Sequence, residues 1–380
     1  MLLLTACLEP YVPEVIQAPH AYLVVEGSIN SRGSSTIRLS RAISLSTVTS
    51  PPAETKATVF IEEEGGMRYP LTEKKAGTYT SAVLSLNAGR RVRLRVATAA
   101  QQEYVSDFTQ VIVTPVIDSI TWKPTGHGLQ IAANAHDDTD QLKYFRWEYE
   151  ETWEFATPFY STVRYDSIKH RVVDRTKSIN KCWQTKVSTN ILLATTAKLG
   201  RSQISEAPIL LLPRTSDKLY KRYSILVKQY AMTKEEYNYW VGLQKNTQNI
   251  GTLFDPLPSQ IAGNMHSVHN PEEVVLGFIS CQSVTEKRIF ADRAKLPYDW
   301  PYVSGYELCM ADTLPKKNDY RMTSNRELFQ LFENVNYIIP IERLKVAKIN
   351  GRDTIYYYSF STADCVDCRT RGVLKKPIFW

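Results

Sequence analysis

The stretch from Lys221 to Cys281 decides the fold, and it reads KRYSILVKQYAMTKEEYNYWVGLQKNTQNIGTLFDPLPSQIAGNMHSVHNPEEVVLGFISC. Its beginning predicts a β-strand, because β-forming residues predominate and the apolar side chains of Tyr223, Ile225 and Val227 occupy alternate positions. A second strand is expected from Val274 to Ser280. Since two strands enclose the stretch, the surrounding domain should be a β domain.

Between these strands the sequence predicts a helix over residues 234–249. Thr233 and Glu236 stand at capping-box spacing, so the hydroxyl can accept a hydrogen bond from the amide of Glu236 while the carboxylate reaches back. Met232 and Tyr237 occupy the positions of a hydrophobic staple. The buried stripe of this helix is expected to comprise Tyr237, Trp240 and Val241. We therefore expect one helix inserted into a β domain.

The rest of the chain divides into four segments. Residues 1–20 hold several prolines without periodicity and should form a tether. Residues 21–115 contain short strands with turn signals about every ten residues, which is typical of an immunoglobulin-like β-sandwich. Residues 116–286 predict a second sandwich, similar to a fibronectin type III module. Residues 287–380 should form a C-terminal extension packed on the second domain. The predicted class is mainly β.

Composition is that of a globular protein, with 43% hydrophobic and 22% charged residues and a net charge of +7 over 380 residues. The only dense basic run consists of four arginines that alternate with apolar residues, namely Arg90, Arg91, Arg93 and Arg95. This pattern is typical of the solvent-facing side of a half-buried strand. We therefore expect no nucleic-acid partner.

The first residues point to export. Leu4-Thr5-Ala6-Cys7 resembles a bacterial lipobox, in which small residues precede the cysteine that receives a diacylglycerol. The apolar residues before Cys7 are too few for a signal peptide, so we expect a start site further upstream. The sequence contains no run of about 18 apolar residues, so it predicts no transmembrane helix. The sequence thus predicts a membrane anchor made of lipid alone.

An exported protein lies in a compartment that permits disulfides. Four cysteines are candidates for such bonds, namely Cys182, Cys309, Cys365 and Cys368, and because Cys281 makes the number odd, one thiol should stay free. The Cys365-x-x-Cys368 spacing also occurs in zinc and dithiol sites. Zinc would need four ligands, and no second pair stands at a useful spacing. Disulfides of this pair with Cys309 or Cys182 are favoured.

Other candidate chemistry is weaker. Four carboxylates surround two tryptophans, as in glycosidases, and these are Glu148, Glu150, Glu151 and Glu154 around Trp147 and Trp153. Asp137, Asp138 and Asp140 resemble the start of a calcium loop but lack its glycine and distal glutamate. His266 and His269 lie in a loop and are expected to be solvated. Since hydrolase and nucleotide-binding motifs are missing, we expect no enzyme, no cofactor and no metal.

Two aromatic segments are the candidate surface for a partner or ligand. One contains Trp153, Phe159 and Tyr160, and the other contains Phe254, Asp255 and Pro256. Aromatic side chains held on a rigid loop bind with little loss of conformational entropy.

Several short motifs occur together along the chain, and they are Cys7 with Glu9 and Pro10, Leu23–Gly27, Ile117–Ile120, Trp147–Trp153, Val227–Tyr230, Tyr237 with Trp240, Gly251–Pro258, Gly263 with Asn264, Cys365–Arg369 and Phe379–Trp380. In this combination the chain resembles the Bacteroidota lipoproteins grouped as domain of unknown function 4249. That family has no established catalytic residues.

The resemblance implies a lipoprotein encoded beside a TonB-dependent outer-membrane transporter. By analogy with other such pairs, it implies a non-enzymatic accessory, lid or substrate-capture subunit on the extracellular face of the outer membrane, with the periplasmic face as the alternative. A second reading is a structural or adhesion module of the envelope built from immunoglobulin-like domains. A third is a hydrolase acting on glycans.

Overall fold

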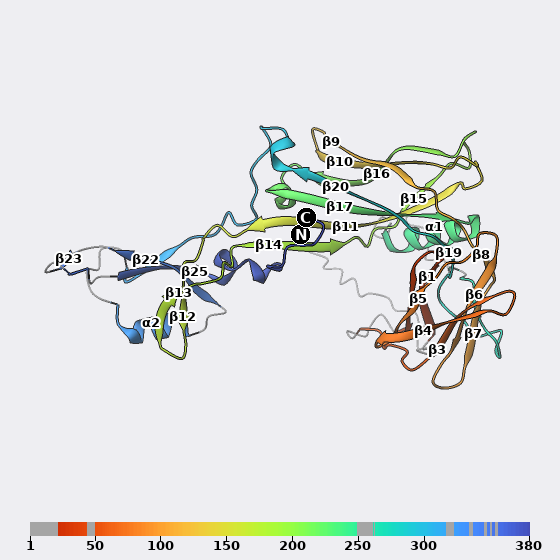
Figure 1. Ribbon diagram of the computed structural model, residues 1–380, viewed down its shortest axis with the longest axis horizontal. Helices are drawn as coiled ribbons and strands as arrows, with labels where there is room; N and C mark the ends of the chain where they lie inside the picture. Colours follow the sequence, from red (N-terminus) through yellow and green to blue (C-terminus); the bar gives the residue numbers. More distant parts are fainter. Residues whose placement is uncertain are drawn as a thin grey trace, which may run out of the picture.

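The computed structural model of the chain (Figure 1) describes residues 22–43, 50–248, 261, 263–316, 323–333, 337–345, 348–349, 352–353 and 356–380. It is 48% strand and 11% helix, which confirms the predicted mainly β class. Two β-sandwich domains lie beside each other, and a smaller lobe, here called the arm, projects from the second domain away from the first (Figure 1). None of the helices in these ranges is long and apolar enough to cross a membrane.

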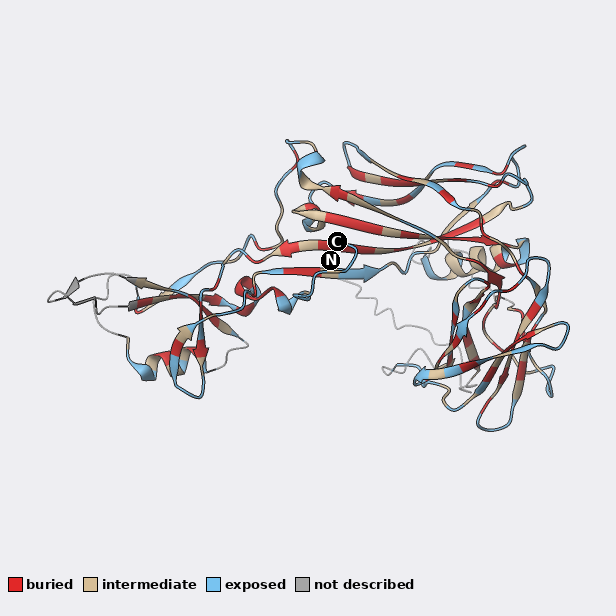
Figure 2. Cartoon of the chain, viewed as in Figure 1, coloured by how far each residue is buried: buried red, intermediate tan, exposed pale blue. Residues whose placement is uncertain are grey.

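The first domain is one curled sheet around a single core, antiparallel except that β19 runs parallel to β1. Its path runs β18-β7-β6-β3-β4-β5-β2-β1-β19, with β8 paired to β6. The strands are β1 (Leu23–Asn30), β2 (Ser34–Arg41), β3 (Thr58–Glu63), β4 (Arg68–Lys75), β5 (Thr78–Val83), β6 (Arg91–Ala97), β7 (Glu103–Ser106), β8 (Thr109–Gln110), β18 (Met265–Ser267) and β19 (Cys281–Gln282). Buried residues recur along these strands, as the period of two requires (Figure 2).

The basic run lies on the outer side of β6, as predicted. Val92, Leu94 and Val96 are fully buried, whereas the intervening arginines point outward. Arg93 pairs with Glu62 at 2.7 Å, and further pairs join Arg91 to Glu64 and Arg95 to Glu103. The positive charge of this strand is thus matched by carboxylates of neighbouring strands.

Part of the decisive stretch belongs to the first domain, although residues up to 286 were expected in the second. β18 pairs with β7, and β19 runs parallel to β1. Residues 274–280, expected as a strand, form only an isolated bridge between Leu276 and Val24. The reason is packing, because Val275 and Ile279 enter the first core. Gly277, at φ +137°, allows the backbone to approach Val25 too closely for any Cβ.

The second domain is a sandwich of two sheets. A three-stranded sheet, β16-β10-β9, faces a five-stranded sheet, β14-β11-β17-β20 with β15 paired to β11. The strands are β9 (Ile117–Pro124), β10 (Gly128–His136), β11 (Tyr144–Ala156), β14 (Lys181–Val187), β15 (Leu192–Thr195), β16 (Gln203–Pro213), β17 (Arg222–Met232) and β20 (Thr285–Asp292). The alternation predicted for β17 is confirmed, because Tyr223, Ile225 and Val227 are all in the core.

Helix α1 (Lys234–Gln248) follows β17, as the sequence predicts, and the amide of Glu236 donates to the Thr233 hydroxyl at 3.1 Å. The other predicted hydrogen bond of the capping box, in which the Glu236 carboxylate reaches back to the start of the helix, was wrong. The Glu236 carboxylate instead accepts from the Ser280 hydroxyl at 2.9 Å and from the Trp240 indole at 3.3 Å. It is the one fully buried side chain of the helix, whereas Tyr237, Trp240 and Val241 are half-buried.

The arm combines two distant parts of the chain. The hairpin of β12 (Val163–Asp166) and β13 (Arg171–Asp174) packs Tyr165 against Phe332 of α2 (Asn325–Phe332). A three-stranded sheet completes it, formed by β21 (Asp312–Leu314), β25 (Tyr356–Thr362) and β22 (Ile338–Lys345). A small hairpin, β23 (Lys348–Ile349) with β24 (Arg352–Asp353), and the short helix α3 (Ala363–Val366) also belong to this region. The extension from residue 287 thus builds a lobe as well as packing on the second domain.

Two crossings of the chain between the domains run side by side. The Ile112 amide donates to the Cys281 carbonyl, and the Ser283 amide donates to the Ile112 carbonyl, both at 3.0 Å. The Thr114 hydroxyl donates to the Ser283 carbonyl at 2.5 Å and accepts from the Ala231 amide at 3.1 Å. Gln229 adds a bond from its side-chain amide to the Pro115 carbonyl. These buried hydrogen bonds fix one domain on the other.

We expect Thr114→Val to lower the free energy of unfolding by about 2–4 kcal/mol, because an isosteric methyl leaves a buried carbonyl and a buried amide without partners. Chemical denaturation measures this loss. Thr58→Val, at an exposed position of β3, is the matched control and should change stability by less than about 0.5 kcal/mol. Equal effects of the two substitutions would contradict the role given to Thr114.

Burial raises the pKa of Glu236 above its ordinary value, while Arg146 and the hydrogen bonds of Ser280 and Trp240 oppose the rise. The folded chain therefore holds this proton more tightly than the unfolded chain does. As pH rises from about 4.5, the unfolded chain loses the proton first and wild-type stability falls.

We therefore expect Glu236→Gln to become more stable relative to wild type as pH rises from about 4.5 towards 8, since glutamine does not titrate. Denaturation midpoints at several pH values measure this. The control is Glu235→Gln, at an exposed neighbouring position. A stability difference that stays constant over this range would contradict the assignment.

Candidate functional site

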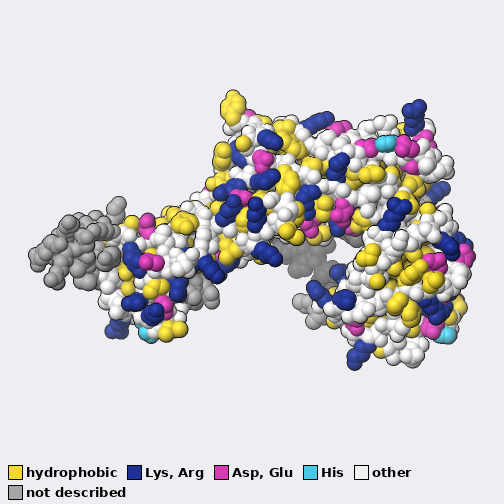
Figure 3. Space-filling view, in the orientation of Figure 1, with side chains coloured by type: hydrophobic (Ala, Val, Ile, Leu, Met, Phe, Trp, Pro, Cys, Tyr) yellow, Lys and Arg dark blue, Asp and Glu magenta, His cyan; other side chains and the backbone are white. Residues whose placement is uncertain are grey.

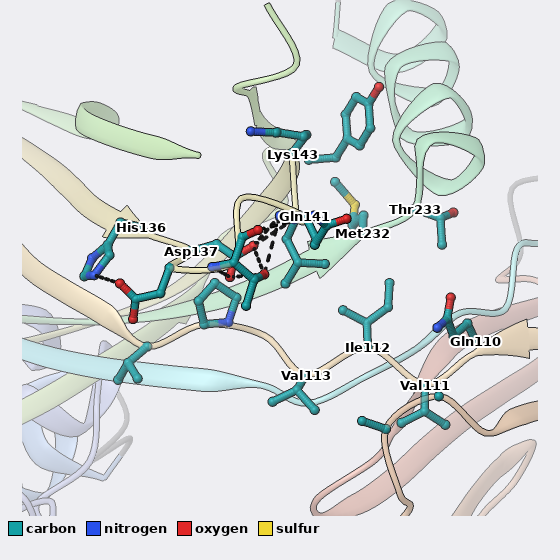
Figure 4. Close-up of a pocket in the computed structure, with 18 of the residues that line it drawn as sticks. Gln110, Val111, Ile112, Val113, His136, Asp137, Gln141, Lys143, Met232 and Thr233 are labelled. Carbon is teal, nitrogen blue, oxygen red and sulfur yellow. Dashed lines mark hydrogen bonds and ion pairs between the residues drawn. The ribbon is translucent and has the colours of Figure 1, made fainter. Parts of the chain in front are cut away.

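A hollow lies where the two domains meet (Figure 4). It has a volume of about 830 Å³. The crossing segment 110–116 forms one wall, the turn from His136 to Tyr144 forms another, and residues 232–234 at the start of α1 close the third side. Val111, Ile112, Val113 and Met232 are among its apolar lining residues (Figure 4). We refer to it as the junction hollow.

Its polar wall is the loop of residues 137–142, which is held by hydrogen bonds within the loop itself. The Asp137 carboxylate accepts from the amides of Gln141 and Leu142, at 2.9 and 2.8 Å, and from the Thr139 hydroxyl. Burial works against ionisation of Asp137, but these bonds outweigh it and its pKa lies below the ordinary value. The loop therefore presents a fixed shape to the hollow.

His136 stands at the edge of the same hollow. Its Nδ1 lies 2.7 Å from the Asp118 carboxylate, and this hydrogen bond raises the pKa of the imidazole above its ordinary value. Apolar walls with a few oriented polar groups are typical of a binding surface.

The acidic residues of this loop do not form the calcium site considered above. Both oxygens of Asp137 are used within the loop, and Asp138 lies 93% exposed beside His136. His266, the other metal candidate, pairs with Asp107 at 3.1 Å. Within the described ranges no group of three or more His, Cys, Asp or Glu side chains could hold a metal ion.

The four carboxylates near Trp147 and Trp153 are each tied to a different partner. Glu148 pairs with Arg146, Glu150 with Arg288, Glu151 with Lys218, and Glu154 with Lys181. Glu151 also accepts from the Tyr223 hydroxyl in the core. The arrangement brings no two of them to one shared partner, so it favours structural ion pairs over the acid–base pair of a hydrolase.

The cysteines form two disulfides, Cys182–Cys368 and Cys309–Cys365. All four residues are those proposed from the sequence, and the adjacent pair Cys365 and Cys368 bonds to two different segments. Cys281 is the free thiol and is buried. These bonds tie the last part of the chain to β14 and to the loop before β21.

The predicted aromatic surface is changed by the structure. Trp153 is only 6% exposed, because it packs in the second core with the Lys218 ammonium over its ring, so it cannot contact a partner. Phe159 packs at the root of the arm, whereas Tyr160 is 59% exposed and remains on the surface. Phe254, Asp255 and Pro256 lie outside the described residues, as does Cys7.

The segment before β21 presents an apolar surface that sequence reasoning missed, formed by Leu308 and Met310, which are exposed by 93% and 81%. Tyr298, in the same segment, and Ile378, in the C-terminal tail, are further large hydrophobic side chains exposed by more than 80%. In the space-filling view, exposed hydrophobic side chains alternate with Lys and Arg over the second domain (Figure 3). The signal in the sequence was the run of prolines and aromatics around residues 297–302, which predicts a rigid loop.

The fold and these surfaces define a β-rich, disulfide-bonded protein with two sandwich domains and a projecting arm. The chain matches the family model of domain of unknown function (DUF4249) over residues 8–288, so it belongs to this family. No curated protein matches it.

Solved structures give only weak matches. The adhesin InvE of Yersinia pseudotuberculosis is 14% identical, with a TM-score of 0.15 over 55% of this chain and 54% of that one. The chitinase ChiA74 of Bacillus thuringiensis is 10% identical, with a TM-score of 0.15 over 47% and 29%. A structure of manganese lipoxygenase of Gaeumannomyces graminis with part of zonadhesin of Komagataella pastoris is 9% identical, with a TM-score of 0.16 over 57% and 90%. The chain thus spans about half of the adhesin chain and under a third of the chitinase chain.

Burial raises the pKa of the Cys281 thiol to about 12, with the nearby Glu236 adding to the effect. We expect iodoacetamide at pH 8 to leave the folded protein unlabelled at this residue and to label it fully after denaturation without reductant. Mass spectrometry measures the labelling, and the two disulfide-linked peptide pairs in the same digest serve as the internal control. Rapid labelling of Cys281 in the folded protein would contradict its placement in the first core.

Proposed function

We propose that this chain is a non-enzymatic lipoprotein, anchored through Cys7 at the outer membrane and facing outward, and that it serves as an accessory, lid or substrate-capture subunit of a TonB-dependent transporter. The observation that carries the proposal is the arm, which stands away from both sandwiches and is fixed by disulfides at its base. A projecting element held in one orientation suits docking to a large partner.

The disulfides support export. Disulfides form and persist mainly in oxidising compartments, which agrees with a lipobox at Cys7. Cys182–Cys368 closes a loop of 186 residues and Cys309–Cys365 one of 56 residues. Closing loops of this length removes conformational freedom from the unfolded chain, by about 4–5 kcal/mol each in the chain-entropy model. The bonds therefore stabilise the folded state in which the C-terminal part of the chain is tied to the second domain.

The apolar surface supports a protein partner. Leu308 and Met310, exposed by 93% and 81%, lie in the segment that leads from the second domain into the arm, next to the disulfide of Cys309. Large apolar side chains held beside a covalent constraint have little entropy to lose on binding. Docking through this face would leave the junction hollow, at the other end of the second domain, open to a ligand.

We expect the lipidated, tagged protein, extracted from its native outer membrane in mild detergent, to carry a TonB-dependent barrel in equal amount. Replacing both Leu308 and Met310 by Asp should reduce the recovered barrel by about tenfold or more, since the charges would be desolvated at the contact. Val83→Asp, on an exposed β5 position of the first domain, is the control and should retain the barrel.

Mass spectrometry of the eluate and intact-mass measurement of the Cys7 lipid give the two readouts. Recovery of the wild-type protein alone would contradict the proposal and favour an envelope adhesion or structural module. Retention of the barrel by the Leu308→Asp, Met310→Asp variant would overturn the role given to this face.

A further inference from the structure

A second cavity, distinct from the junction hollow, lies between the two domains. Its volume is about 420 Å³. Its floor is formed by β11 and β17, where Arg146 is directly opposite Tyr230 and Glu148 is opposite Lys228. Helix α1 contributes Glu236 and Trp240. The first domain contributes polar residues of β1 and β2, namely Ser28, Asn30, Ser34 and Thr36. We refer to it as the interdomain cavity.

Arg146 is the central cation of this cavity and is only 6% exposed. Its guanidinium carbon lies 4.3 Å from the ring centres of both Tyr230 and Trp240, so two aromatic rings hold the group in place. One nitrogen, Nη1, donates to Glu148 at 2.5 Å. The buried Nε atom has no hydrogen-bond partner in the described chain. The Arg146 Nε–H group is thus held at this wall without an acceptor in the part of the chain that the structure describes.

Glu236 provides the complementary group and is 1% exposed. Its Oε1 atom accepts from Ser280 and Trp240, whereas its Oε2 atom has no partner among the described residues. Leaving such a buried polar atom unpaired is unfavourable, because it loses its hydrogen bonds to water without gaining others. Arg146 forms its ion pair with Glu148 and not with Glu236. An arrangement serving only to join the domains would be expected to pair these two groups.

We propose that the interdomain cavity binds a small, neutral polyhydroxyl compound, a sugar or polyol of one or two rings. The lining contains two cations, and each already has a carboxylate partner, because Arg146 pairs with Glu148 and Lys228 pairs with Glu286. A charged ligand would find no unpaired counter-charge in this partly desolvated space. Arg146 Nε and Glu236 Oε2 are covered in this structure, so a ligand hydroxyl pairs with them only when the side chains over them move aside. It then accepts from Arg146 Nε and donates to or accepts from Glu236 Oε2, whichever protonation state that carboxyl has.

The first domain supplies part of the cavity lining, so the site exists only when the two domains lie against each other. Asn30, Ser34 and Thr36 add further donors and acceptors from β1 and β2, and the Phe278 side chain adds an apolar surface. Apolar walls with convergent polar groups in a volume of roughly 300–1,000 Å³ are typical of sites for small molecules. The inference does not rest on the proposed transporter partner, because all of these residues belong to this chain.

The test is ligand-observed saturation-transfer NMR on the full chain, with glucose, galactose, sucrose and glycerol as probes and glucuronate and glucosamine as charged counterparts. We expect saturable binding of at least one neutral probe at concentrations up to about 10 mM. Thr36→Trp should fill the cavity from an exposed strand position and weaken binding by about tenfold or more. Thr58→Trp places the same bulk on β3, away from the cavity, and should bind as wild type does.

Glu236→Ala should also weaken binding by about tenfold, whereas Glu236→Gln should retain it within about threefold because the amide still donates and accepts. Circular dichroism of each variant establishes folding before binding is measured, and the Thr36→Trp pair keeps the test decisive if Glu236→Ala does not fold. The proposal is overturned by any of three results: no neutral probe binds, a charged counterpart binds more tightly than its neutral parent, or binding survives Thr36→Trp unchanged.

Discussion

The structure depends on the hydrogen bonds between two crossing segments. The chain leaves the first domain through residues 111–116 and leaves it again through residues 281–285, and both passages lie side by side. Thr114 and Ser283, both nearly fully buried, satisfy one another and the Ala231 amide. Because these groups have no access to water, separating the domains would leave several of them unpaired. Two sandwiches that could have been linked flexibly therefore behave as one body.

This constraint gives the cavities their form. The junction hollow uses the first crossing segment as a wall, and the interdomain cavity takes residues from β1 and β2 on one side and from β11, β17 and α1 on the other. Each would lose its shape if the domains moved apart. At the opposite end of the second domain, two disulfides tie the arm to that domain, whereas the junction between the two sandwiches is held by hydrogen bonds. One molecule thus presents a ligand-sized space at one end and a fixed apolar surface towards the other.

The sequence predicted correctly those features that depend on residues close together in the chain. The alternation in β17, the Thr233 cap of α1 and the arginine face of β6 could be read from neighbouring residues. The four disulfide cysteines followed from the expected export and the cysteine count, whereas their pairing did not. What failed depended on distant partners. Glu236 was predicted to cap the helix, but its carboxylate is buried, where it accepts a hydrogen bond from Ser280 and is attracted by the positive charge of Arg146. Trp153 was read as part of an aromatic surface on a loop, yet strand β11 continues through it and buries it. Residues 264–283 return to the first domain, which no local period could reveal.

Amide hydrogen exchange at the crossing segments tests the central claim most directly. If the domains form one body, the amides of Thr114, Ala231 and Ser283 should exchange as slowly as those in the middle of β6 and β17, because all would open only when the molecule unfolds. Exchange at these three amides that is faster by about a hundredfold or more, with both cores still protected, would show that the domains separate in the native state. That result would contradict the account of the junction and of both cavities built on it.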